Sequence, residues 1–149
     1  MANHRHGFTL IEVTIVAAII AIIAAIAIPN LLQSRVRANE ATAIENLRVI
    51  TAAQFGYNAA KSTFGDFASL SDLAGGPVSG FLDVSWEEGV IKTGYVYSMP
   101  VFNPGTFECY ADPEAPGHTG VRYFRVDASG IVRYAFNGHP DEAAPAIGD

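Results

Sequence analysis

The chain has 149 residues, enough for one domain of ordinary size. Only 16% of its residues are charged, against about 25% in a typical soluble protein. The formal net charge is -6, and residues 62–149 hold four Lys or Arg against twelve Asp or Glu. Because phosphate binding requires a basic surface, we expect no direct nucleic-acid binding.

The excess of apolar residues lies near the N-terminus. After a short polar stretch, residues 1–7, the segment from Phe8 to Ile28 is apolar apart from Glu12 and two threonines. Its 21 residues would run about 31 Å as a helix, which is enough to cross a bilayer. The sequence therefore predicts a membrane-spanning helix over residues 8–28.

The same helix is predicted to continue to residue 61. Apolar residues recur at spacings of three, four and seven and form one stripe, with the charged residues mostly outside it. The stripe is Leu32, Val36, Ala43, Leu47, Ile50 and Tyr57, and the charged residues are Arg35, Arg37, Glu40, Glu45 and Arg48. Because the stripe continues beyond Pro29, we expect a kink there rather than a helix end. The stripe is expected to pack on the domain that follows.

Residues 62–149 hold nearly all of the glycine and proline and read as a small antiparallel sheet. A short helical turn is predicted around Leu70–Leu73. Four strands are predicted, at Tyr95–Met99, Thr106–Ala111, Val121–Val126 and Ile131–Phe136, the last two joined by a turn at residues 127–130. The predicted fold class is α+β, one long N-terminal helix on a four-stranded sheet.

Glu12 is the unexpected residue of the apolar segment. A carboxylate at membrane depth costs about 2.5–3.5 kcal/mol, so a plain anchor has no use for it. Cleavage after Gly7 would create an amine on Phe8 that could pair with Glu12, most naturally between neighbouring subunits. The alternative is that Glu12 lies at the membrane surface and stays hydrated.

We expect no enzymatic activity and no cofactor. The four histidines, His4, His6, His118 and His139, do not have metal-ligand spacing. The alternative is a calcium ion held by loop carboxylates such as Asp112, Glu114 or Asp127. Cys109 has no second cysteine to pair with, and we expect it to be a small buried residue on a strand.

The segment Gly7-Phe8-Thr9-Leu10-Ile11-Glu12-Val13 resembles the type III signal of type IV pilins and of type II secretion pseudopilins. The resemblance implies that a membrane peptidase cuts after Gly7 and N-methylates Phe8. It also implies that Glu12 pairs with a neighbour's terminal amine, and that Pro29 is the helix-loosening proline. Residues 111–131 are similar to the C-terminal part of bacterial type IV pilins, although the disulfide that many of them have is missing here.

The resemblance implies a structural subunit of a type IV pilus, and a major one. It implies a type IV pilin fold, with a leader over residues 1–7, a long helix over 8–61 and a globular head over 62–149. The expected partners are identical subunits, the prepilin peptidase and N-methyltransferase, and the assembly platform with its ATPase. The precursor would cross the inner membrane once before it joins a cell-surface filament.

Two alternatives stay open. In the same class, the chain could be a pseudopilin of a type II secretion system. In another class, it could be a binding domain that never polymerises and is either anchored in the membrane or secreted. Cleavage after Ala25-Ile26-Ala27 would release such a domain with Ile28 at its start.

Overall fold

The computed structural model of the chain describes residues 8–61, 66–75 and 80–148. Two compact units are present, an N-terminal unit, Met1–Ser34, and a C-terminal unit, Arg35–Asp149. Helix α1, Leu10–Ala60, belongs to both units. The predicted helix over residues 8–61 is therefore present to within two residues at either end.

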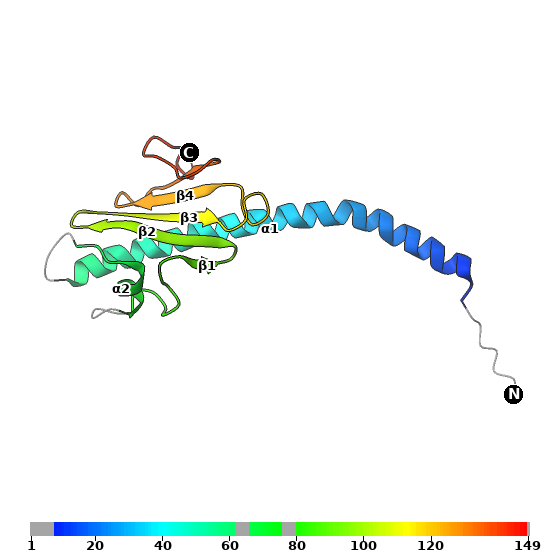
Figure 1. Cartoon of the computed structure of the whole chain (residues 1–149), viewed down its shortest axis with the longest axis horizontal. Coiled ribbons are helices and arrows are strands. Elements are labelled where there is room, and N and C mark those ends of the chain that lie inside the picture. The colour runs from blue at the N-terminus through cyan, green and yellow to red at the C-terminus, as the bar shows by residue number, and fades with distance from the viewer. Residues whose placement is uncertain (1–7, 62–65, 76–79, 149) are drawn as a thin grey trace, which may run out of the picture. The chain divides into compact units, whose positions relative to one another are not determined.

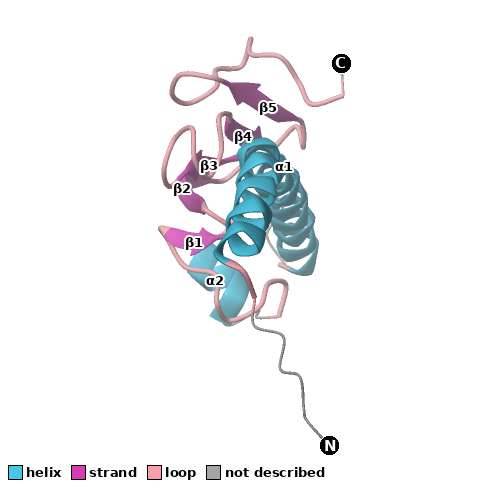
Figure 2. Ribbon diagram, turned by 90° about the vertical axis from the view of Figure 1, so that its right-hand side faces the viewer, coloured by secondary structure: helices cyan, strands magenta, loops and turns pink. Residues whose placement is uncertain are grey.

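In the C-terminal unit α1 lies against one face of a five-stranded sheet (Figures 1 and 2). The helix α2, Leu70–Gly75, precedes the sheet, and its first turn is capped by Ser69, whose Oγ accepts the backbone N–H of Asp72 at 3.1 Å. Every neighbouring pair of strands is antiparallel, and the spatial order follows the chain order. The strands are β1, Val90–Lys92, β2, Tyr95–Asn103, β3, Thr106–Pro113, β4, Tyr123–Asp127, and β5, Val132–Ala135. The α+β fold class is confirmed.

All four predicted strands exist, but the predicted number was wrong because β1 was missed. It has only three residues, between Gly89 and the Thr93-Gly94 turn, too few to show an alternating pattern. Strand β2 also runs past its predicted end at Met99, beyond an irregularity between Ser98 and Val101. The backbone N–H of Met99 donates there to the carboxylate of Glu88, at 3.0 and 3.1 Å.

The core of the C-terminal unit lies between α1 and the sheet. The helix contributes Ala43, Leu47, Ile50 and Tyr57, the part of the predicted stripe that is buried. Alternate residues of β2 and β3 meet them, including Tyr95, Tyr97, Phe107 and Cys109, all fully buried. The expectation for Cys109 is thus confirmed, and burial raises the pKa of its thiol. Leu32, also in the predicted stripe, is 57% exposed.

Polar side chains of α1 attach the helix to the rest of this unit. Glu40, which the charge pattern assigned to the solvent-facing side, is only 6% exposed. Its carboxylate accepts the backbone N–H groups of Val121 and Arg122 at 2.9 and 3.1 Å and pairs with the Arg122 guanidinium at 2.8 Å. Buried Gln54 bonds both backbone groups of Ala68. These contacts join residues 14 to 82 positions apart, so helical periodicity gives no sign of them.

Candidate functional site

The start of α1 is closed by a reciprocal cap between Thr9 and Glu12. The backbone N–H of Glu12 donates to Thr9 Oγ1 at 3.3 Å, and Glu12 Oε2 accepts the backbone N–H of Thr9 at 3.4 Å. The Thr9 hydroxyl also donates to Glu12 Oε2 at 3.3 Å. This is the capping box, in which two helix-terminal N–H groups are satisfied by side chains. This cap was not predicted, although Thr9-x-x-Glu12 is its sequence signature.

The surface of the chain from Phe8 onward, on both sides of this cap, is apolar and is not covered by the rest of the chain. Phe8 is 83% exposed and Leu10 is 82% exposed. Twelve more large aliphatic residues, from Ile11 to Leu32, are each more than half exposed. Among the described residues, α1 is the helix long and apolar enough to cross a membrane. Such a surface requires either lipid or other protein around it.

Pro29 lies inside α1, so the helix does not end there. A proline has no N–H, which leaves the carbonyl of Ala25 without its usual partner. Side chains supply extra bonds in the next turn, where Asn30 Nδ2 donates to the Ile26 carbonyl at 3.0 Å and Ser34 Oγ donates to the Asn30 carbonyl at 2.9 Å. The kink at Pro29 stays a prediction. Gly7 and the cleavage site before Phe8 depend on residues 1–7, which lie outside the described residues.

Two of the loop carboxylates considered for calcium, Asp112 and Asp127, already have other partners. Asp112 pairs with His139 at 2.7 Å, and Asp127 lies 3.4 Å from Arg125 and accepts the backbone N–H of Ser129 at 2.8 Å. Glu114 is exposed. Within the described ranges, no three His, Cys, Asp or Glu side chains are grouped so that they could hold a metal ion.

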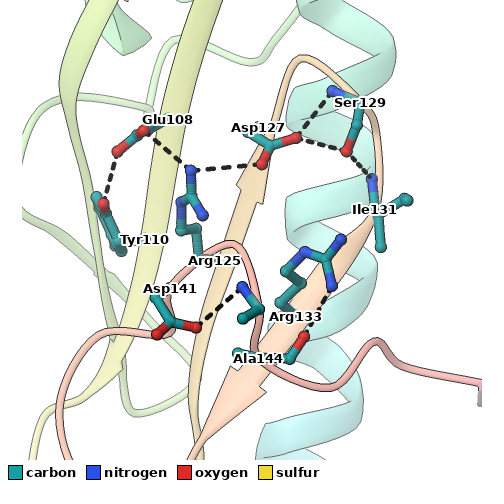
Figure 3. Close-up of polar contacts among 10 residues, drawn as sticks. Glu108, Tyr110, Arg125, Asp127, Ser129, Ile131, Arg133, Asp141 and Ala144 are labelled. Atoms are coloured by element: carbon teal, nitrogen blue, oxygen red, sulfur yellow. Dashed lines mark hydrogen bonds and ion pairs between the residues drawn. The ribbon is translucent and has the colours of Figure 1, made fainter.

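Arg125 anchors a polar cluster on the sheet face that points away from α1 (Figure 3). Its side chain is 5% exposed and its Nη2 pairs with Glu108 at 2.9 Å, and Glu108 also accepts the Tyr110 hydroxyl at 2.7 Å. Burial and the Glu108 carboxylate raise the pKa of Tyr110 to about 12. Burial raises the pKa of Asp127, but hydrogen bonds from Ser129 and the two nearby arginines outweigh it and lower that pKa below its ordinary value.

The C-terminal segment, residues 136–148, is held without a disulfide. Arg133 Nη1 donates to the Ala144 carbonyl at 2.7 Å, and the backbone N–H of Ile147 donates to the Val132 carbonyl at 2.8 Å. The His139 ring stacks on Tyr110, with centroids 4.2 Å apart. The absent disulfide is therefore replaced by hydrogen bonds and packing against β3 and β5.

An exposed apolar helix near the N-terminus is what a prepilin-type sequence is expected to show, and the comparisons with known proteins agree. A family model described as "Prokaryotic N-terminal methylation motif" matches residues 2–28 of the chain. The resemblance to prepilin-type proteins is confirmed.

Two named relatives are type IV pilins. Over 65 residues the chain is 46% identical to the type IV major pilin protein PilA of Myxococcus xanthus, a match that covers 44% of this chain and 30% of the relative. Over 38 residues it is 63% identical to the type IV wide pilus major component PilA4 of Thermus thermophilus, covering 26% of this chain and 29% of the relative. The chain thus covers less than a third of the length of either relative.

Proposed function

We propose that the chain is a structural subunit of a type IV pilus, of the major pilin kind, and that its work is assembly rather than catalysis. The observation that carries the proposal is the exposed apolar surface of residues 8–32. Near its start, the carboxylate of Glu12 caps the first turn of α1. The methylation motif and the two pilin relatives support it.

The apolar helix has two environments in which its surface is satisfied. In the inner membrane, lipid covers it and its backbone is satisfied internally, as spanning requires. In a filament, helices of identical subunits cover it, and burial of apolar surface contributes about 25 cal/mol per Å². Small side chains let such helices approach closely. These are Ala17, Ala18, Ala21, Ala24 and Ala25.

Glu12 would fix the register of this packing. After cleavage behind Gly7, the new amine of Phe8 carries a positive charge that the carboxylate of a neighbour's Glu12 can pair with. A subunit in the wrong register would leave that carboxylate buried and unpaired, which is costly. The partners that this scheme requires are the prepilin peptidase and N-methyltransferase, an assembly platform and its ATPase.

Three variants separate the charge of Glu12 from its capping role. Glu12→Gln keeps a side chain that can cap but removes the charge, Glu12→Ala removes both, and Thr9→Ala weakens the cap but keeps the charge. We expect all three chains in the membrane fraction and sheared filaments only from Thr9→Ala and the unmodified chain. Immunoblots of membranes and electron microscopy of sheared material measure this.

Normal filaments from Glu12→Gln would reduce Glu12 to a helix cap and refute the register role. The N-terminus of the mature chain tests the alternatives in the same material. Phe8 supports the pilin, Ile28 supports a secreted domain, and Met1 supports a plain anchor. A pseudopilin would be processed in the same way but would not be the most abundant protein of the surface filaments.

A further inference from the structure

The C-terminal unit has a hollow of about 400 Å³ beside β5. The larger apolar side chains that line it are Ile131, Val132 and Ile147. Two arginines, Arg48 of α1 and Arg133 of β5, line it as well, and Gly130 and Ala146 complete its wall. The side chain of Arg48 is 58% exposed, and its ion pair with Glu45, at 3.8 Å, is a surface pair of little strength. No carboxylate among the described residues lines the hollow. A complementary partner is therefore apolar and acidic.

The same unit presents a segment of this kind on the loop before β1. Val84 is 91% exposed, the most exposed large apolar side chain of the described residues. It follows Asp83, and Glu87 and Glu88 come shortly after it. Among the described residues of this unit, none of the other exposed large apolar side chains has an acidic residue within two positions in the sequence. They are Val49, Phe55, Ile91, Phe102, Val121, Ile131 and Phe136.

The tip formed by Asp83–Ser85 is held in a fixed shape. Asp83 accepts the backbone N–H of Ser85 at 2.8 Å and also bonds its hydroxyl. Lys92 lies 3.5 Å from the Asp83 carboxylate and 4.2 Å from the ring centroid of buried Trp86. Lys92 therefore offsets part of the charge of Asp83, and Glu87 and Glu88 follow the tip in the sequence as two further acidic residues. Since the tip is already ordered, little conformational entropy is lost when it binds.

The tip and the hollow lie at opposite edges of one sheet. The tip leads into β1, where the backbone N–H of Val90 donates to the Glu87 carbonyl at 3.1 Å. The hollow is built on β5, and the strand order runs from β1 to β5 (Figure 2). A molecule cannot bring its own two edges together, so a contact between them joins two copies. A contact between different surfaces of identical copies gives a ring if its rotation closes and a helical filament if it does not, and the filament is the form that the proposed function requires.

We propose that the Val84 tip of one copy docks into the Arg48–Ile131 hollow of a neighbouring copy. This inference rests on the proposed pilus function and adds a second contact to it, between heads rather than between apolar helices. Asp83 of the first copy then faces Arg48 of the second, which sets the orientation of the contact.

Disulfide trapping in assembled filaments tests the contact. The variant Val84→Cys, Ile131→Cys has both partners on every subunit, while Cys109 is fully buried and does not interfere. Mild oxidation of sheared filaments should give a ladder of dimers and higher multimers on a non-reducing gel, and a reductant should collapse it. The matched control is Val84→Cys, Val121→Cys, because Val121 is exposed to a similar extent, 46% against 42% for Ile131, and lies outside the hollow.

Filaments without a ladder, or an equal ladder from the control, would overturn the contact and leave the pilus function standing. If the unmodified chain forms no filaments, it is the pilus function that fails. Should the cysteine variant not assemble, a charge exchange decides. We expect Asp83→Lys and Arg48→Asp each to lower the yield of sheared filaments about tenfold, and the double variant to restore most of it. A double variant no better than the singles would refute the contact.

Discussion

At the scale of single residues, Gly120 is the described glycine at which an added Cβ would meet the closest neighbour. Tyr95 is fully buried, and its hydroxyl donates to the Arg122 carbonyl at 2.9 Å. A Cβ on Gly120 would lie 1.9 Å from that hydroxyl oxygen, far inside contact distance. The reason for this glycine is therefore the close approach of a tyrosine from β2.

We predict that Gly120→Ala destabilises the C-terminal unit by about 1–3 kcal/mol, because the tyrosine or the backbone must move. Urea unfolding of the full chain in detergent micelles measures this. Gly75→Ala is the control, since nothing lies within 4 Å of a Cβ there and the position is helical. Equal midpoints for the two variants would contradict the packing argument.

Whether the role of a single residue could be predicted depended on how far away its partners lie in the sequence. The roles proposed for Phe8 and Glu12 come from a local motif, and Thr9 could have been included because Thr-x-x-Glu is equally local. Glu40 could not be assigned correctly. Its partner Arg122 is 82 residues away in the sequence. Because the sequence does not show that the two residues pair, a charged residue beside an apolar stripe is predicted to face solvent.

At the scale of elements, the helices and strands whose apolar residues recur at a regular spacing were predictable. The helix and the strands β2 to β5 follow hydrophobic spacing, so they were found with boundaries off by a few residues. The short strand β1 escaped because three residues show no period. The C-terminal segment escaped as well, since it is held through backbone bonds to β5 and the His139–Asp112 pair rather than by a pattern of its own.

The turn between β4 and β5 depends on an ionised carboxylate. Asp127 accepts the backbone N–H and the hydroxyl of Ser129, at 2.8 and 2.5 Å. Its pKa in the folded chain lies below the ordinary 3.8. A lowered pKa means that Asp127 contributes its full stabilisation above the ordinary value, and that this stabilisation is lost as the pH falls through the folded-state pKa.

We predict that Asp127→Ala lowers the free energy of unfolding by about 1–2 kcal/mol at neutral pH, the equivalent of one or two hydrogen bonds. The difference from the unmodified chain should shrink as the pH is lowered past 3.8. Urea unfolding at a series of pH values measures this. Glu114→Ala, at an exposed side chain, is the control and should leave stability at neutral pH unchanged. A difference that stays constant with pH would show that the charge of Asp127 does not matter.

At the scale of the whole molecule, charge and apolar surface are divided between the two units. Residues 1–34 contain one basic and one acidic residue, Arg5 and Glu12, so the net charge of -6 belongs to residues 35–149. The buried core likewise begins at Ala43 and lies entirely in the C-terminal unit. The predicted division into residues 1–7, 8–61 and 62–149 places its boundaries at the ends of the long helix, and it stays a prediction. The two compact units instead divide the chain within α1, because the buried side chains of its second half belong to the core of the C-terminal unit.

From this division we predict that residues 35–149 alone form a folded, soluble monomer that does not assemble. The fragment keeps every core residue, and its net charge favours solubility. Sedimentation should give one monomeric species, and urea unfolding should be cooperative. Leu47→Ala in the same fragment removes a fully buried side chain and should cost about 2–5 kcal/mol, which shows that the measurement reports on this core. An aggregated fragment, or one without cooperative unfolding, would mean that the N-terminal unit is needed for folding as well as for assembly.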